Sequence, residues 1–189
     1  WCQSAAVRVR MLKEIFGDRL EVEWRSYLLI PEKRDRTLEK FRQYPRSWLK
    51  VASDKPGGSF QTWSTQEQPP SHSIPPHLVA KAAAQVDESA FELVHDALLT
   101  AYFVENRDIS AETTLKSIWV QAGLDEDQFS TSQDPTHLKS VIDEHNEALT
   151  VGAQGAPSFR MAHHDVAITG LHTVEVLERW INRVLNDEV

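Results

Sequence analysis

Hydrophobic residues recur at helical spacing over the first part of the chain. Between residues 4 and 16 they fall on one face, and Gly17 follows at the position where many helices end. From residue 19 to residue 29 the spacing changes to alternation, in the order Leu20, Glu21, Val22, Glu23, Trp24 and Arg25. The pattern predicts a helix followed by a strand with one buried face.

The next part of the chain shows weaker periodicity and ends in a proline-rich stretch. One short helix is expected within residues 37–52. Residues 67–76, which read EQPPSHSIPP, are expected to form an irregular connection because proline cannot continue a helix or a sheet ladder.

Helical spacing then continues from residue 77 to residue 149, and no strand pattern interrupts it. We expect side chains that accept hydrogen bonds from free N–H groups to cap three helices here, namely Asp87, Ser110 and Asp134. Pro135 follows the last of these in the first helical turn, where its missing N–H costs nothing. The sequence therefore predicts an all-helical block.

Strand patterns return after this block. Residues 156–161 (APSFRM) and 165–170 (DVAITG) are strand candidates, and Thr173 is positioned to cap a final helix. The two ends of the chain together supply an α/β layer that the helical block interrupts. A strand ahead of Trp1 would complete a βαβ unit with the first helix and strand.

Composition places the chain among globular proteins and narrows its partners. It has 189 residues, of which 41% are hydrophobic and 25% charged. The formal net charge of −8 argues against a nucleic-acid partner, and no stretch is long and apolar enough to cross a membrane. The first residue is Trp and not Met, so we expect further residues upstream; with that provision we expect a cytoplasmic protein.

Cys2 is the only cysteine, and it stands where the first helix is expected to begin. Unpaired N–H groups and the positive end of the helix dipole favour the thiolate there, and the thiolate is the nucleophilic form. A lone cysteine excludes a disulfide within these residues and is more commonly a small buried hydrophobic residue. The position is consistent with a chemical role for Cys2 but does not establish one.

The stretch AHHD at residues 162–165 contains imidazole and carboxylate groups, which zinc accepts as ligands. Adjacent residues of a strand point to opposite faces, however, so they do not converge on one ion. A polar turn between the two strand candidates accounts for the stretch better, and we expect no metal site.

Several segments, in order along nearly the whole chain, resemble the DsbA-like thiol–disulfide oxidoreductases, and among them the FrnE-like branch. They are WCQSAAVRVRML, VEWRSYLL, PPSHSIPPHLVAKAA, FELVHDALLTAYFVENRDIS, AGLDEDQF and GAPSFRM. The resemblance implies an α/β, thioredoxin-like fold with an all-helical insertion. Residues 1–76 would supply its first part with the first strand missing upstream, residues 77–149 the insertion, and residues 150–189 the second part with a cis-proline strand.

The resemblance also implies a reaction centre. In this family the first helix begins with a Cys-x-x-Cys motif, and Trp1-Cys2 matches its last two positions. Cys2 would then be the resolving cysteine, and the attacking cysteine would lie two residues upstream. Pro157, if its peptide bond is cis, would bring the Ala156 backbone beside the sulfur atoms, where it can pair with an extended substrate. The implied catalytic residues are Cys2 and Pro157, and the implied substrate-binding residues are Trp1, Gln3, Ala156 and His72.

Several properties follow from this resemblance. The expected partner is a protein or small molecule that bears a disulfide or a thiol, and no metal or nucleotide is required. Glutathione is a candidate co-substrate. His72 taken alone is more typical of a surface histidine, and nothing in the sequence indicates the oligomeric state.

Three alternatives stay open. Cys2 could align with the attacking position, with Ser4 or Ala5 in place of its partner. Kappa-class glutathione transferases and 2-hydroxychromene-2-carboxylate isomerases share the fold and insertion but use a serine or a single thiol with bound glutathione. A non-catalytic binding module would keep the fold and have an unreactive Cys2. A cysteine two places before Cys2 favours the oxidoreductase, and a serine favours the glutathione enzyme.

Overall fold

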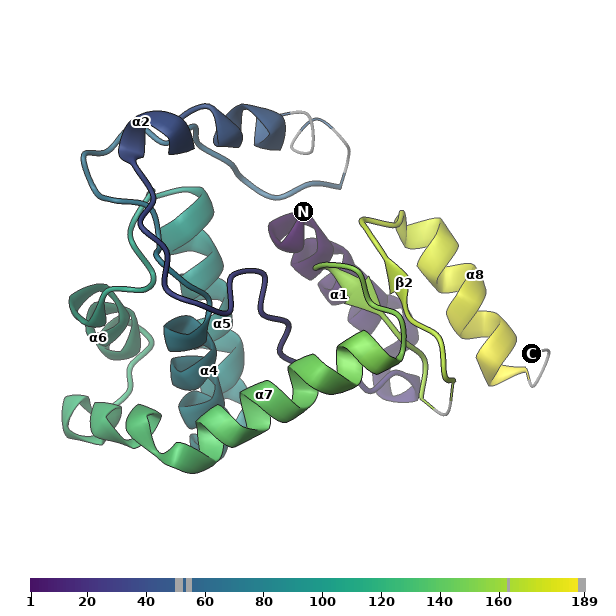
Figure 1. Ribbon diagram of the computed structural model, residues 1–189. Coiled ribbons are helices and arrows are strands. Elements are labelled where there is room, and N and C mark those ends of the chain that lie inside the picture. Colours follow the sequence, from purple (N-terminus) through teal and green to yellow (C-terminus); the bar gives the residue numbers. More distant parts are fainter. Residues whose placement is uncertain (50–52, 54–55, 163, 187–189) are drawn as a thin grey trace.

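The computed structural model describes residues 1–49, 53, 56–162 and 164–186, and its elements form three groups (Figure 1). The first group joins the two ends of the chain: α1 (Cys2–Phe16), the short 3-10 helix η1 (Gly17–Arg19), β1 (Ser158–Phe159), β2 (Ile168–Thr169) and α8 (Val174–Leu185). The second is helical: α4 (Ile74–Val86), α5 (Glu88–Phe103), α6 (Glu112–Gln121), the 3-10 helix η3 (Glu126–Gln133) and α7 (Pro135–Thr150). The third is small: α2 (Leu38–Phe41) and the 3-10 helix η2 (Tyr44–Ser47).

Helix α1 confirms the helical spacing of residues 4–16, and it begins at Cys2, where the first helix was expected to begin. It ends at Gly17, whose φ of 53° lies in the left-handed region that favours glycine. Leu12 and Phe16 lie in one hydrophobic cluster with α8 and the strand pair. The first and last parts of the chain therefore share a core, as the predicted α/β layer requires.

Strands β1 and β2 confirm the two strand candidates but are shorter. They pair antiparallel, with Ser158 opposite Thr169 and Phe159 opposite Ile168. His163, in the predicted turn between them, lies outside the described residues. Thr173 caps α8 as expected, since its hydroxyl accepts a hydrogen bond from the Val176 N–H.

The helical group packs α4 against α5, α6 and α7 around a core centred on Ala83, Val94, Ile118 and Trp119. Helix α4 begins at Ile74, three residues before the predicted helical block, and α7 ends at Thr150. The division of the chain into domains at these points stays a prediction.

Two of the three predicted caps are confirmed. The carboxylate of Asp87 accepts a hydrogen bond from the Ala90 N–H, and that of Asp134 accepts one from the Thr136 N–H. The prediction for Ser110 is wrong, because Ala111 occupies the N-cap of α6. The N–H and hydroxyl of Ser110 instead donate to the Asp108 carboxylate, which closes a local turn.

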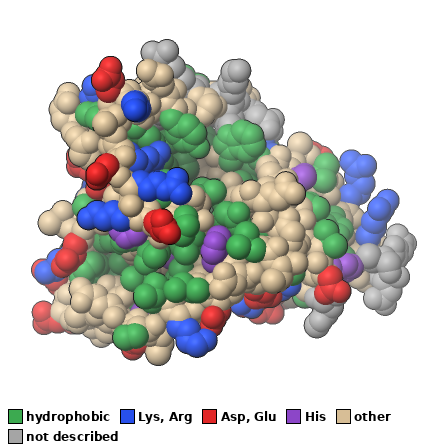
Figure 2. Space-filling view, viewed as in Figure 1, with side chains coloured by type: hydrophobic (Ala, Val, Ile, Leu, Met, Phe, Trp, Pro, Cys, Tyr) green, Lys and Arg blue, Asp and Glu red, His purple; other side chains and the backbone are tan. Residues whose placement is uncertain are grey.

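The third group contributes Phe41 to an aromatic cluster, and Trp48, which directly follows η2, Trp63 from the loop beside it, and Tyr102 and Phe103 of α5 complete the cluster. The single short helix expected within residues 37–52 is divided into α2 and η2, and residues 50–52 lie outside the described residues. Hydrophobic side chains gather in the recess between this group and the start of α1 (Figure 2). No helix of the described chain is long and apolar enough to span a membrane.

The prediction of a strand at residues 19–29 is wrong, although the alternation correctly predicts which side chains are buried and which are exposed. Leu20, Val22 and Trp24 are half-buried, and the charged residues between them are exposed. Residues 20–28 form no helix or turn and pair with no described strand, and a bend follows at residues 29 and 30; we call residues 20–30 the extended segment. Alternation thus predicts which side of a chain is buried, and a strand also needs a backbone partner.

Side chains take the place of that backbone partner. The N–H groups of Ser26, Leu28 and Ile30 donate to side-chain atoms of α7 and of the residue before α4. The acceptors are Glu144 at 2.7 Å, Nδ1 of His145 at 3.2 Å and Oγ of Ser73 at 3.0 Å. These three donors of the extended segment are therefore satisfied without a sheet.

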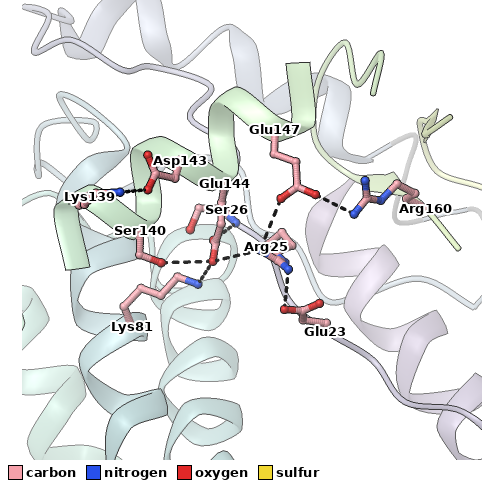
Figure 3. Close-up of polar contacts among 10 residues, drawn as sticks. All are labelled: Glu23, Arg25, Ser26, Lys81, Lys139, Ser140, Asp143, Glu144, Glu147 and Arg160. Atoms are coloured by element: carbon pink, nitrogen blue, oxygen red, sulfur yellow. Dashed lines mark hydrogen bonds and ion pairs between the residues drawn. The ribbon is translucent and has the colours of Figure 1, made fainter. Parts of the chain in front are cut away.

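Glu144 is the centre of this arrangement (Figure 3). Its carboxylate is buried and accepts hydrogen bonds from the Ser26 N–H and from Lys81 of α4, and Arg25 lies 3.9 Å away. Burial opposes its ionisation, yet the hydrogen bonds from Lys81 and Ser26 outweigh burial and hold the pKa of Glu144 below its usual range. Three separate parts of the chain thus meet at one charged carboxylate.

Substitution Glu144→Gln should reduce the free energy of unfolding at neutral pH by about 1–3 kcal/mol, because Lys81 and the Ser26 N–H lose a charged acceptor. The pKa of Glu144 is lower in the folded than in the unfolded protein. Its contribution is therefore present above the unfolded value of 4.5 and is lost as the pH falls below it. Urea unfolding at a series of pH values measures this difference.

Asp143→Asn is the matched control. Asp143 is adjacent on α7, but its ion pair with Lys139 is exposed, so its loss should cost less than about 1 kcal/mol. Burial lowers the pKa of His77 to about 4, and the Glu144 carboxylate raises it in part, so the pH dependence that Glu144→Gln removes includes the coupling between these two groups. A difference between wild type and Glu144→Gln that stays constant through the acid range would contradict the assignment.

Candidate functional site

Cys2 is the first residue of α1, and Trp1 occupies the N-cap position. The Trp1 carbonyl accepts the first helical hydrogen bond, from the Ala5 N–H at 2.9 Å. The Cys2 thiol is free and half-buried, whereas 51% of the Trp1 surface is exposed. The helix start thus presents an indole to solvent with a partly shielded thiol behind it.

Burial raises the pKa of the Cys2 thiol, and a hydrogen bond from its own backbone N–H lowers it in part. The position at a helix start favours the thiolate, but desolvation outweighs that effect in the folded protein. The thiol form of Cys2 therefore predominates near neutral pH. A shielded thiol of this kind is a weak first nucleophile.

A glycine loop covers the first turn of α1. A Cβ atom at Gly58 would lie 2.3 Å from Cγ of Gln3, so a larger residue would displace this contact. The Gly58 N–H also donates to the hydroxyl of Ser4, which is completely buried. Gln3 therefore faces the loop at residues 56–58.

Arg8 fixes this loop to α1 and to the segment that leads into α8. Its side chain is completely buried, and it donates from Nε to the Pro56 carbonyl at 3.1 Å and from Nη1 to the His172 carbonyl at 2.7 Å. Two segments more than 100 residues apart in sequence thus converge on the second turn of α1.

Tyr102 of α5 packs against the aromatic cluster of Phe41, Trp48 and Trp63. Burial is the largest influence on its hydroxyl and raises the pKa, the Arg36 guanidinium opposes it, and a negative charge on Cys2 adds only a small further increase. The hydroxyl therefore stays protonated at physiological pH.

The Ala156–Pro157 peptide bond is cis. The Pro157 carbonyl accepts from the Gly170 N–H at 2.9 Å, and the Ser158 hydroxyl donates to the Gly155 carbonyl at 2.7 Å. Phe159, two residues later, packs into the cluster that contains Leu12 of α1. The strand that follows Pro157 thus lies against α1, the helix that carries Cys2.

His72 lies in a separate hydrogen-bonded group. Its Nδ1 pairs with the Ser71 hydroxyl at 2.9 Å, and the Ser71 N–H and hydroxyl pair with the Ser110 hydroxyl at 2.9 and 3.1 Å. Ser110 in turn donates to Asp108. The structure places His72 at the entry to α4, and a role in substrate binding stays a prediction.

Sequence reasoning missed Arg8, Gly58 and Tyr102. Arg8 is a charged residue within a helix, a pattern that usually indicates a solvent-facing position. Tyr102 lies 100 residues from Cys2 and reads as a core residue of α5. The pair Gly57-Gly58 was the one available signal, since glycine in a loop commonly marks a close approach of the backbone.

No group of three or more potential ligand residues is arranged for a metal ion within the described part of the chain. The AHHD stretch is described only in part, because His163 lies outside the described residues. The chemistry visible at the start of α1 is that of a thiol and its hydrogen-bonding neighbours.

Comparison with known proteins identifies the family. The sequence model described as DSBA-like thioredoxin domain matches residues 1–182, and the chain belongs to this family. No curated protein sequence matches the chain.

Solved structures agree in fold. A candidate protein disulfide isomerase from Nitrosomonas europaea has a TM-score of 0.83 at 18% identity, over 100% of this chain and 93% of that protein. The cytosolic disulfide reductase DsbM from Pseudomonas aeruginosa has a TM-score of 0.72 at 18% identity, over 99% and 92% of the two chains. Its structure with GSH gives 0.71 at 20% identity, over 99% and 93%. The predicted thioredoxin-like fold is confirmed.

Substitution Arg8→Met should destabilise the protein by about 2–4 kcal/mol, because two carbonyls that Arg8 satisfies lose their donor in a buried place. Arg10→Met is the matched control on the same helix. Arg10 pairs with Asp96 at 2.7 Å, but both side chains are half exposed, so the loss should be less than about 1 kcal/mol. Thermal and urea unfolding compare the two, and equal effects would contradict the role of Arg8.

Proposed function

We propose that the protein is a thiol–disulfide oxidoreductase of the FrnE-like branch, in which Cys2 is the second cysteine of a Cys-x-x-Cys motif. Residues 1–76 and 150–189 would form its thioredoxin-like domain, and residues 77–149 the insertion. The observation that carries the proposal is a shielded cysteine as the first residue of α1, in a chain of the DSBA-like family.

The reaction proceeds by two thiol–disulfide exchanges. The thiolate of the upstream cysteine attacks one sulfur of a substrate disulfide, which forms a mixed disulfide and releases the other substrate sulfur as a thiolate. Cys2 then loses its proton and attacks the upstream cysteine's sulfur in that mixed disulfide. The substrate leaves as a dithiol, reduced by two electrons, and the protein is left with one disulfide. The reverse sequence oxidises a dithiol.

The environment of Cys2 suits the second step. Burial raises the pKa of its thiol, so Cys2 reacts little with disulfides in solution. In the mixed disulfide the target sulfur would already be held beside it, and proximity compensates for low thiolate content. A resolving role therefore accounts for the shielding better than an attacking role.

Substrate contacts would come from several segments around the start of α1. Trp1 offers an exposed indole, and Gln3, which faces the loop at Gly58, and the Ala156 backbone would offer hydrogen-bonding groups. Pro157 would set the direction of the Ala156 backbone. His72 would contact only the outer part of a substrate.

Glutathione is the proposed co-substrate, and the cytoplasm is the proposed location. The support is the similarity to DsbM, which is described as a cytosolic disulfide reductase and has a structure with GSH. A glutathione enzyme of the kappa or isomerase type would place a serine where the proposal places the upstream cysteine. The two proposals therefore differ at one residue.

A thiol count on the intact protein tests the motif. We expect two thiols that become accessible to an alkylating reagent only after reduction, because Cys2 would be paired in the oxidised form. Mass spectrometry before and after reduction gives the count. A single thiol in both states would contradict the dithiol mechanism and favour a glutathione enzyme or a binding module.

Substitution Cys2→Ser tests the resolving role. Reduction of glutathione disulfide should lose nearly all turnover, while the upstream cysteine still forms a mixed disulfide that accumulates and is visible by mass. Ser59→Ala, an exposed change in the loop beyond Gly58, should leave both measurements unchanged. Unchanged turnover in Cys2→Ser would show that Cys2 does not resolve the intermediate.

A further inference from the structure

A groove of about 360 Å³ lies between β2 and α8, away from the start of α1. It is lined by Ile168, Val176, Arg179, Trp180 and Arg183. In Figure 1 these elements form the edge of the molecule opposite the helical group, and basic side chains stand out over α8 in Figure 2. The volume lies within the range of roughly 300–1,000 Å³ that is typical of small-molecule sites.

The apolar wall of the groove is fixed by the core. Ile168 and Trp180 are partly buried and pack against the hydrophobic cluster shared by α1 and α8. Val176 is 41% exposed and completes the wall on the open side. An indole held in place by its buried face offers a flat apolar surface at little entropic cost to a ligand.

Two cations stand beside this wall, and within the described part of the chain no carboxylate forms an ion pair with either of them. Arg179 and Arg183 are one helical turn apart, and like charges at this spacing repel. Neither guanidinium has an ion pair within 4.0 Å or a hydrogen bond to any described residue. Glu175 lies one turn before Arg179, but its pKa is held low chiefly by N–H and hydroxyl groups at the helix start and less by Arg179.

The positive charge of this groove is unusual for an acidic chain. The net charge is −8, yet the groove is lined by two arginines and no carboxylate. A second cavity, of about 300 Å³ beside α7, contrasts with it: its cations and carboxylates pair with one another, as Figure 3 shows. Of these two cavities, only the groove at α8 therefore has charged side chains that are available to bind a ligand.

We propose that this groove binds a small organic carboxylate with an apolar body. The guanidinium groups of Arg179 and Arg183 hold the carboxylate, since arginine offers paired N–H donors that match its two oxygens. The apolar body lies against Trp180, Ile168 and Val176. The site is independent of Cys2 and of the proposed redox activity.

The test is a titration of the intact protein with 4-phenylbutyrate, followed by NMR through its backbone and indole N–H signals. We expect saturable shifts confined to residues of β2 and α8. Acetate, which lacks the apolar body, and 4-phenylbutylamine, which carries the opposite charge, should each bind at least about tenfold more weakly.

Variants distinguish binding by the two arginines from a general effect of the charge of the protein. Arg179→Gln/Arg183→Gln should weaken 4-phenylbutyrate binding at least about tenfold. Lys33→Gln/Arg34→Gln removes the same charge from an exposed loop and should leave the affinity unchanged. If the double variant at α8 does not fold, the single variant Arg183→Gln and the wild-type shift map decide the question.

Several results would overturn the proposal. These are equal binding of the amine or of acetate, shifts that map outside β2 and α8, unchanged affinity in the arginine variants, and an absence of saturable shifts. Weaker binding in both double variants would show that net charge, and not the groove, attracts the anion.

Discussion

A guanidinium buried inside a protein must find acceptors for its N–H groups, and Arg8 finds them in two segments that are far apart in the sequence. The Pro56 carbonyl belongs to the loop over the first turn of α1, and the His172 carbonyl belongs to the segment that leads into α8. Because both acceptors converge on one side chain, the loop, the strand pair and the thiol-bearing helix hold one arrangement. The site around Cys2 depends on that arrangement, since its parts come from each of these segments.

The electrostatics of Cys2 follow from the same packing. At the start of α1 the thiol lies at the positive end of the helix dipole, which favours the thiolate. Burial of the thiol in the folded protein removes water from it and outweighs the dipole, so the pKa of Cys2 is raised. The two effects act in opposite directions, and only the folded structure shows that desolvation is the larger.

Periodicity predicted most of the fold because it reports burial, and burial is what the sequence encodes directly. The helices from α4 to α7, the two strand candidates and the caps at Asp87, Asp134 and Thr173 could all be predicted from spacing and residue type, whereas the cis bond before Pro157 was implied only by the family resemblance. Ser110 failed as a cap because Asp108, two residues earlier, competes for its N–H and hydroxyl. The site could be predicted only in part from the sequence. Cys2 and Pro157 carry local signals, but Arg8 acts through contacts with residues 56 and 172 that no spacing rule connects.

The extended segment shows a different dependence on sequence. In a sheet, the partner of a backbone N–H is another backbone carbonyl, which every residue type provides, so substitutions leave the pairing in place. Here the Ser26 and Leu28 N–H groups bond to the side chains of Glu144 and His145, 118 and 117 residues away. The path of this segment therefore depends on the identity of two residues of α7. During divergence we expect positions 144 and 145 to be constrained more tightly than the extended segment itself, whose side chains can vary while its backbone stays in place.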